Sequence, residues 1–367
     1  MSDAIDPALN ELIERVRAAR SAGAGLDIRG QDSKRFYGQA PRGEPLSTLK
    51  LCGISSYQPS ELVVTARAGT PLAELEAALT ERGQCLPFEP PRFGGRGTVG
   101  GMVATGLSGP ARMAVGSVRD HVLGATLLNG RGEVLSFGGQ VMKNVAGYDV
   151  SRLLVGSLGV LGLICEVSLK VLAHPRAQAS LRFEMPQAEA LQQVQRWLGE
   201  ALPVSASAWL DGQLTVRFSG APAAVRAAAG RLGGERLADA AAQTFWSELR
   251  DHAHDFFVRA DAAVTRGATL WRLALPPTAP PLPTDQAELV EWDGGQRWVC
   301  LDDGGDTLRE WAASNGGHAT RFKAVNKTEA VFSPLRSPLD TVHRRLKLAF
   351  DPDNVFNGGR LYPGLGA

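Results

Sequence analysis

The sequence lacks long apolar runs and closely spaced cysteines. No stretch approaches the roughly 18–20 apolar residues that a helix needs to span a bilayer. The four cysteines, at positions 52, 85, 165 and 300, lie far apart, and no CxxC pair is available for a zinc ion or an iron–sulfur cluster. We therefore expect no metal centre and a reducing, cytoplasmic setting.

The sequence also has no excess of charge of one sign, because 39 Lys and Arg residues are balanced by 38 Asp and Glu residues, for a formal net charge of +1. This balance argues against a nucleic-acid partner and against a disordered acidic tail. Residues 1–20 mix apolar and charged positions at helical spacing, without the apolar core and cleavage site of a signal peptide. The composition is that of a globular protein.

The chain has 367 residues, 44% of them hydrophobic, which predicts two or three domains. We expect an α+β domain over residues 1–175, ending at His174-Pro175. Residues 176–310 begin in β-α-β-β-α order, typical of a ferredoxin-like α+β cap. Residues 311–367 form a third segment, with a helix near 338–350 and a turn-rich end. A single helix is expected over residues 244–257.

Three glycine-rich segments lie within the first 175 residues, at 30–34, 95–100 and 156–162. Glycine allows backbone N–H groups to approach a diphosphate closely. Taken singly, the first segment reads as a simple turn and the third as tight packing around a buried turn. Taken together, they fit a long cofactor that lies across one domain.

The second segment, Gly95-Arg96-Gly97-Thr98-Val99-Gly100, is a literal GxGxxG. A Rossmann fingerprint must follow a strand and open a helix. Here prolines precede the segment, and Gly106, Gly109 and Pro110 follow it, which makes a helix unfavourable. We therefore expect no Rossmann NAD site, and the absence of GxxxxGK[ST] argues against an ATPase.

Several segments, taken in order, resemble the FAD-binding domain of the vanillyl-alcohol oxidase/PCMH superfamily. The nearest resemblance is to the flavin-binding subunits of bacterial glycolate oxidases. The segments that carry it are residues 29–34, 86–87, 98–101, 118–124, 143–149, 156–164, 316–322 and 355–360. The resemblance implies a PCMH-type fold of two α+β subdomains, a cap, and a C-terminal segment that returns to the flavin.

The resemblance also implies FAD and a set of contacts, and because no residue stands out as a point of covalent attachment, we expect the FAD to be noncovalent. The first two glycine loops would hold the diphosphate, the third would follow the adenosine and ribityl portion, and the C-terminal turn would approach the isoalloxazine. The implied FAD-binding residues are Gly30, Gln31, Asp32, Ser33, Lys34, Gly97, Thr98, Gly100, Gly101, Gly106, Arg119, Asp120, Gly159, Leu161, Gly162, Ile164, Asn357 and Arg360.

Three positions depart from the family's motifs. The first loop reads Arg-Gly-Gln-Asp-Ser-Lys in place of RGGGTS, Leu158 replaces a common Glu, and Gly358 replaces a common Pro. Asp32 beside a diphosphate is unfavourable unless its side chain turns away, while Lys34 can compensate for its charge.

Oxidation of a 2-hydroxy acid needs a base for the hydroxyl and a cation for the carboxylate. His318 and Arg321 are the candidates, and a surface turn with a structural histidine is the alternative. His252 and His254 form an H-x-H, but residues two apart on one helix do not face together, which argues against a metal site. His121 is either close to the flavin or hydrogen-bonded within the fold.

The resemblance implies a complex with a second flavoprotein subunit (D) and an iron–sulfur subunit (F), which oxidises glycolate to glyoxylate. The complex would be cytoplasmic or held peripherally at the inner membrane through its partners. Two roles remain open for this chain: oxidation of the 2-hydroxy acid itself, or an electron-relay or structural role.

Overall fold

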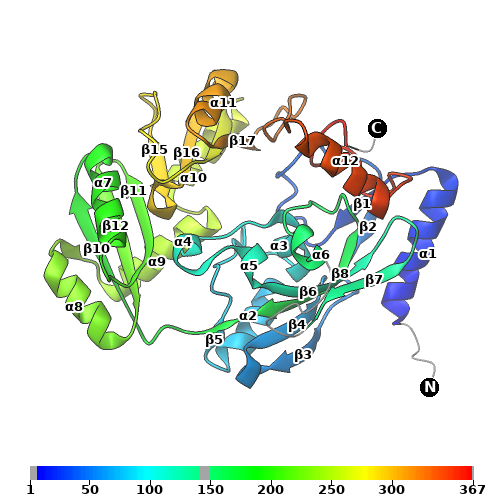
Figure 1. Cartoon of the computed structure of the whole chain (residues 1–367), viewed down its shortest axis with the longest axis horizontal. Coiled ribbons are helices and arrows are strands. Elements are labelled where there is room, and N and C mark those ends of the chain that lie inside the picture. The colour runs from blue at the N-terminus through cyan, green and yellow to red at the C-terminus, as the bar shows by residue number, and fades with distance from the viewer. Residues whose placement is uncertain (1–5, 140–148, 366–367) are drawn as a thin grey trace.

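A computed structural model describes residues 6–139 and 149–365, which form an α+β unit and a cap beside it (Figure 1). The chain begins with helix α1 (Pro7–Ala22), which Asp6 caps by accepting a hydrogen bond from the Ala8 N–H, and Gly23 ends it in a left-handed conformation. Strand β1 (Leu26–Arg29) then pairs in parallel with β2 (Glu44–Ser47). Leu12 and Val16 of α1 pack into one apolar cluster with Leu26 and Leu46.

A five-stranded antiparallel sheet forms the second subdomain. Its order is β3-β4-β8-β6-β7, and its strands are β3 (Ile54–Gln58), β4 (Val63–Arg67), β8 (Leu163–Lys170), β6 (Val122–Leu128) and β7 (Val134–Gly138). The remaining elements around it are η1 (Pro59–Glu61), α2 (Leu72–Thr80), β5 (Gln84–Cys85), α3 (Val99–Thr105), α4 (Arg112–Val115), α5 (Val118–His121), α6 (Val150–Leu153) and β9 (Leu172–Ala173). Leu75 of α2 and Val103 of α3 are buried against the sheet residues Leu127 and Val167.

The cap is one antiparallel sheet of eight strands, in the order β13-β10-β12-β11-β15-β16-β14-β17. Its first half has the β-α-β-β-α-β succession and strand order of a ferredoxin-like unit. These elements are β10 (Ala177–Glu184), α7 (Gln187–Leu198), β11 (Val204–Leu210), β12 (Gln213–Gly220), α8 (Pro222–Leu232) and β13 (Glu235–Arg236). This half confirms the fold expected for the cap.

The second half of the sheet repeats that strand order. Its elements are β14 (Thr269–Ala274), β15 (Glu288–Glu291), η2 (Trp292–Gly294), β16 (Gln296–Leu301), α11 (Gly305–Ser314) and β17 (His318–Lys323). A proline-containing connection stands where the first half has α7. The halves join through β11 and β15, where Ala208 pairs with Glu291 and Trp209 with Val290.

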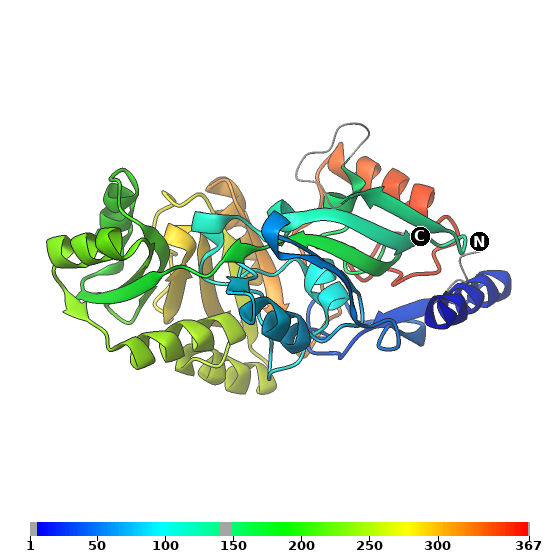
Figure 2. The same cartoon turned by 90° about the horizontal axis from the view of Figure 1, so that it is seen from below.

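Helices α9 (Asp239–Asp251) and α10 (Asp255–Thr265) pack on one face of the cap sheet (Figure 2). The single helix expected over residues 244–257 is therefore wrong: His252, with φ of 56°, ends α9, and His254 caps α10. The expected cap boundary at residue 310 also needs correction, because it would cut α11 and would separate β17 from its partner β14.

Helix α3 is a third correction, because Gly106, Gly109 and Pro110 argued against a helix after the glycine motif. Thr98 caps α3 by accepting a hydrogen bond from the Gly101 N–H, and Val99, Met102 and Val103 are buried. Capping and burial outweigh the poor helix propensity of glycine. No parallel strand precedes the motif, so it remains distinct from a Rossmann fingerprint.

The last part of the chain returns to its beginning. Helix α12 (Leu339–Phe350) leads to a turn in which Phe356 forms a parallel bridge with Leu26 of β1. Within the described residues, no helix has the length and apolar character needed to cross a membrane.

Candidate functional site

An open cavity lies where the three glycine-rich segments and the C-terminal turn meet. Its empty volume is about 820 Å³, including its mouth. It places most of the residues expected at the cofactor together. Those that line it are Gly30, Gln31, Asp32, Ser33, Lys34, Thr98, Gly100, Gly101, Gly159, Gly162, Ile164, Asn357 and Arg360.

Two of the glycines are required by close packing. A Cβ atom on Gly30 would lie 2.5 Å from the Thr98 hydroxyl oxygen, so the first two glycine loops touch at this point. Gly159 has φ of +75°, and a Cβ on it would lie 2.8 Å from the Asn357 amide nitrogen. Larger side chains at either position would push the walls of the cavity apart.

Gln31 ties the first two loops together. Its Oε1 accepts a hydrogen bond from the Gly97 N–H at 2.7 Å. Gly97 itself does not line the cavity, and its N–H is used in this contact. Gln31, which stands where the family's motif has glycine, thus adds a contact between the two loops.

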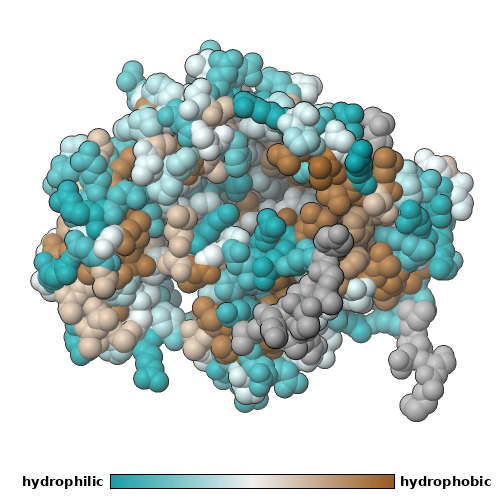
Figure 3. All heavy atoms as spheres, in the orientation of Figure 1, coloured by the Kyte–Doolittle hydropathy of each residue, from teal (hydrophilic) through white to brown (hydrophobic). Residues whose placement is uncertain are grey.

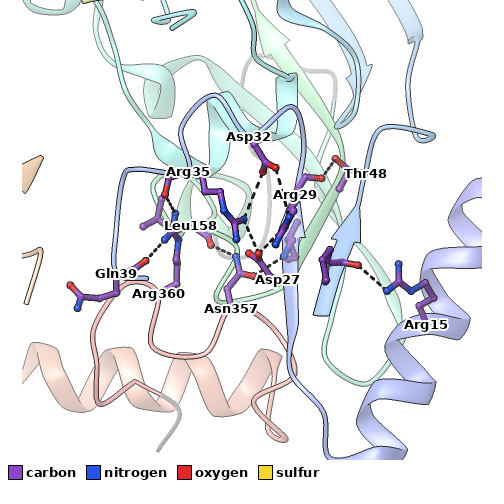
Figure 4. A network of polar contacts seen from close by, with 12 residues as sticks. Arg15, Asp27, Arg29, Asp32, Arg35, Gln39, Thr48, Leu158, Asn357 and Arg360 are labelled. Atoms are coloured by element: carbon purple, nitrogen blue, oxygen red, sulfur yellow. Dashed lines mark hydrogen bonds and ion pairs between the residues drawn. The ribbon is translucent and has the colours of Figure 1, made fainter. Parts of the chain in front are cut away.

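Asp32, which stands where the family's motif has glycine, adopts a left-handed conformation with φ of 56°. Its carboxylate is 43% exposed and lies toward Arg29 and Arg35, at 4.0 and 3.9 Å (Figure 4). These two arginines also donate to the buried carboxylate of Asp27, both at 2.8 Å. The negative charges at this end of the cavity are therefore compensated within the protein.

Lys34 is the cation that remains uncommitted among the described residues lining the cavity. Its side chain is buried, and its Nζ has no hydrogen-bond partner there. Burial lowers the pKa of Lys34 to about 8, although the charge of Asp251 opposes this shift. Among the described residues, four cations (Arg29, Lys34, Arg35, Arg360) and two carboxylates (Asp27, Asp32) line the cavity, so these residues contribute a net charge of +2.

Asn357 and Arg360 attach the C-terminal turn to this cavity. Asn357 accepts a hydrogen bond from the Ile28 N–H at 2.9 Å and donates to the Leu158 carbonyl at 2.6 Å. Arg360 donates to the carbonyls of Arg35 and Gln39. Burial lowers the pKa of Arg360 to about 10.

A buried ion pair behind the turn was missed from the sequence. Lys347 and Asp351 lie 2.6 Å apart and are almost fully buried. Lys347 Nζ also donates to the carbonyls of Val160 and Phe356, both at 2.9 Å. Asp351 accepts hydrogen bonds from the backbone N–H groups of Val355 and Phe356 at 2.9 and 2.8 Å. Only the i, i+4 spacing of Lys and Asp could have indicated this pair.

Four further residues expected at the cofactor do not line the cavity. Gly106 ends α3 with φ of 61°, Leu161 is buried in the core of the second subdomain, and Arg119 is exposed. Asp120 forms a capping box with Ser117 in α5. The part of the expected motif at residues 143–148 lies outside the described residues.

The expected pairing of His318 with Arg321 is wrong in its geometry. Both lie on β17, where His318 pairs with Ala274 and Arg321 with Trp271. Residues three apart on a strand point to opposite faces. Arg321 faces Glu329 at 3.3 Å, His318 is exposed at the start of the strand, and neither lines the cavity.

The other histidines have structural contacts. His121 Nε2 lies 2.9 Å from the Val115 carbonyl oxygen, in agreement with a hydrogen bond within the fold. His254 Nδ1 accepts from the Phe256 N–H at 3.3 Å, while the His252 ring stacks on Phe257, with centroids 3.9 Å apart. In the described part of the chain, no three His, Cys, Asp or Glu side chains are arranged to hold a metal ion.

Comparisons with known proteins agree with this geometry. The FAD binding domain family matches residues 8–138. The chain is 45% identical to glycolate oxidase subunit GlcE of Escherichia coli (strain K12), over 96% of this chain and 97% of that protein. It is 34% identical to a D-lactate dehydrogenase of Anaerostipes hadrus, over 38% of this chain and 29% of that protein.

Among solved structures, an alkyldihydroxyacetonephosphate synthase matches with a TM-score of 0.65 and 16% identity, over 95% of this chain and 75% of that one. At this identity the likeness shows the fold, an α+β architecture with an FAD-binding domain of the PCMH type. Because the near full-length similarity extends beyond the FAD-binding domain, the chain belongs to the family of glycolate oxidase subunit GlcE.

Proposed function

We propose that this chain is the FAD-binding subunit of a glycolate oxidase complex, which oxidises glycolate to glyoxylate and passes the electrons on through partner subunits. The observation that carries this proposal is the cavity formed by three glycine-rich segments and the C-terminal turn. FAD, when bound, would supply the redox chemistry, and the protein would bind and orient it.

The residues of the cavity fit FAD. The lining charge of +2, from the four cations and two carboxylates, complements a diphosphate with about two negative charges. Lys34 would meet the diphosphate, because its ammonium is buried without a partner.

We also propose that the flavin is held noncovalently. The described residues that line the cavity include neither cysteine nor histidine. Among these described residues the one tyrosine is Tyr37, and Arg272 donates to its hydroxyl at 3.2 Å. Release of intact FAD from acid-denatured protein tests this point, and flavin that stays with the precipitate would contradict it.

The partners that we propose are the D flavoprotein and F iron–sulfur subunits, and we place the complex in the cytoplasm or peripherally at the inner membrane. Exposed apolar side chains support an interaction surface, since α12 carries Leu339, Val342 and Leu348 in exposed positions. In the space-filling view, apolar residues gather beside this helix (Figure 3).

An electron-relay or structural role is the second candidate. It is favoured by the separation of His318 and Arg321 on opposite faces of β17, which removes the expected base and carboxylate pair. Anaerobic addition of glycolate to the purified chain separates the two candidates. Bleaching of the flavin absorption shows that this chain oxidises the substrate, and an unchanged spectrum favours the relay role.

The visible spectrum of the same preparation tests the proposal as a whole. We expect flavin absorption bands, no turnover with nicotinamide cofactors, and co-purification with the two partner subunits when all are expressed together. A folded chain that neither carries nor takes up FAD would overturn the proposed function.

A further inference from the structure

A buried polar group at the cap end of the flavin cavity has no partner. The Nδ1 of His252 is buried without a hydrogen bond to any described residue, whereas buried polar groups are nearly always bonded. The ring of Phe93 packs edge-on against His252, with centroids 5.0 Å apart. Lys34 Nζ lies 5.7 Å from the centre of the same ring. Phe93 therefore adjoins both His252 and a residue that lines the flavin cavity.

Arg272 belongs to the same location. His252 and Arg272 line one small cavity between the cap and the FAD-binding domain. Arg272 also donates to the hydroxyl of Tyr37 at 3.2 Å, and Tyr37 lines the flavin cavity. The small cavity and the flavin cavity are thus separated by a layer of side chains that includes Tyr37 and Phe93.

The chemistry of the small cavity suits an anion that carries a hydroxyl. Burial and the charges of Lys323 and Arg272 lower the pKa of His252 well below its usual value, so its imidazole is neutral at physiological pH. A neutral imidazole can bond a hydroxyl, and a guanidinium binds a carboxylate. Lys323 is held by Asp261 at 2.8 and 2.9 Å, and Arg250, which also lines the cavity, by Asp251 at 2.6 Å. Among the described residues, Arg272 bonds only the neutral hydroxyl of Tyr37 and has no carboxylate partner. Glu291 also lines the cavity, but it accepts hydrogen bonds from Trp298 and Gln296.

The small cavity has room for about one water molecule, so a ligand needs additional space. Phe93 can provide it. Its φ of 28° is unusual for a bulky residue, and it precedes Gly94 and Gly95, which are exposed and have φ of +69° and +74°. Nothing lies within 4 Å of a Cβ built on either glycine. These glycines leave the backbone room to move, whereas the ring packs against Phe36 and His252, with centroids 5.1 and 5.0 Å away, so a ligand must displace it from both.

We propose that a small 2-hydroxy carboxylate binds in the space that Phe93 now fills, with its carboxylate on Arg272 and its hydroxyl on His252 Nδ1. The site faces the flavin cavity across Lys34. This inference rests on the proposed function for the choice of ligand, and it makes His252 and Arg272 the residues that recognise the substrate.

Calorimetric titration of the full chain with glycolate and with acetate tests the proposal. Acetate is glycolate without its hydroxyl, and prior reduction of the flavin by dithionite prevents oxidation during the titration. We expect glycolate to bind at least tenfold more tightly than acetate. His252→Phe should bring this ratio close to one, because it removes the ring nitrogen and keeps the stacking on Phe257.

The other variants have distinct expected effects. Arg272→Met should weaken both ligands at least tenfold, and Phe93→Ala, on an exposed loop, should strengthen both about threefold. Lys50→Met, on the surface beside Glu11, should change neither. If His252→Phe does not fold, the affinity of Phe93→Ala for the two ligands decides whether the proposed site exists.

Equal affinity for glycolate and acetate, or a glycolate preference that survives in His252→Phe, would overturn the proposal, and so would weaker binding in Phe93→Ala. The flavin content is measured separately beforehand, and a chain without flavin is titrated in the same way. Loss of flavin would thus count against the proposed function, and loss of glycolate selectivity against this site.

Discussion

Asn357 and Leu158 are joined by a hydrogen bond of 2.6 Å, from the Asn357 amide to the Leu158 carbonyl, although 199 positions separate them in the chain. The other end of the same amide accepts from the Ile28 N–H. One side chain near the C-terminus therefore holds β1 and the third glycine segment in place on either side of the cavity (Figure 4).

We expect Asn357→Asp to weaken FAD binding more than tenfold. An aspartate can still accept from the Ile28 N–H, but its second oxygen would face the Leu158 carbonyl without a proton to donate. Equilibrium titration of the flavin-free chain with FAD, followed by flavin fluorescence, measures the change. The exposed Asn326→Asp is the control, and equal affinity in the two variants would contradict the role of the amide.

Gly30→Ala should also weaken FAD binding about tenfold or more. Its Cβ would lie 2.5 Å from the Thr98 hydroxyl, so the residue that caps α3 would have to move away from the cavity. The matched control is Gly230→Ala in α8, where a Cβ meets nothing within 4 Å. The control should raise the free energy of unfolding by roughly 0.5–1 kcal/mol and leave FAD affinity unchanged.

Part of this site could be predicted from the sequence. The order of the motifs, through their resemblance to the family, assigned Gly30, Gly159 and Asn357 to one cofactor. The contact between Gly30 and Thr98 could not be predicted, because it depends on how two loops meet in space. His318 and Arg321 were misjudged because a glycine-flanked segment was treated as a loop, whereas a strand places them on opposite faces. The second half of the cap was missed because a proline-containing connection replaces its first helix.

The affinity for FAD should fall as the pH rises above about 8. Lys34 has a pKa of about 8 in the flavin-free cavity, and a bound diphosphate would raise it. Binding is then strongest while the lysine is protonated, and it weakens by up to about tenfold per pH unit once the pH exceeds the free-state pKa. Lys34→Met should bind FAD more weakly at pH 7 and should show no such slope between pH 7 and 9. A slope of the same size in this variant would assign the effect to another group.

Lys347→Met should destabilise the chain by about 3–5 kcal/mol, because it leaves the buried carboxylate of Asp351 without its counter-ion. The comparison is Arg20→Met, which removes the exposed partner of Asp353 in the same C-terminal segment and should cost at most about 1 kcal/mol. Denaturant unfolding of both variants measures the difference. Similar losses in the two would show that the buried pair has no special role.

Glu291→Gln should make the chain more stable at pH 8 than the parent. Burial raises the pKa of Glu291 from 4.5 to about 7. Between pH 4.5 and about pH 7, the folded state therefore binds more protons than the unfolded state. The parent therefore loses stability as the pH rises from about 4.5 to about 7, by roughly 3 kcal/mol for this group. The glutamine cannot ionise, and its variant should lose this part of the pH dependence. Thermal unfolding at pH 5 and pH 8 tests it, and parallel changes in both proteins would count against the assignment.

The repeated strand order in the cap has a mechanical consequence. Each half is a complete four-stranded unit, and within the described residues only two residue pairs, between β11 and β15, continue the backbone ladder from one half to the other. Side chains supply further connections: Ser207 donates to the Asp293 carboxylate at 2.6 Å, and Gln187 donates to Glu288 at 2.7 Å. The junction therefore depends on side-chain hydrogen bonds as well as on backbone pairing, and the amide hydrogens at Trp209 and Val290 should exchange earlier than those in the middle of either half.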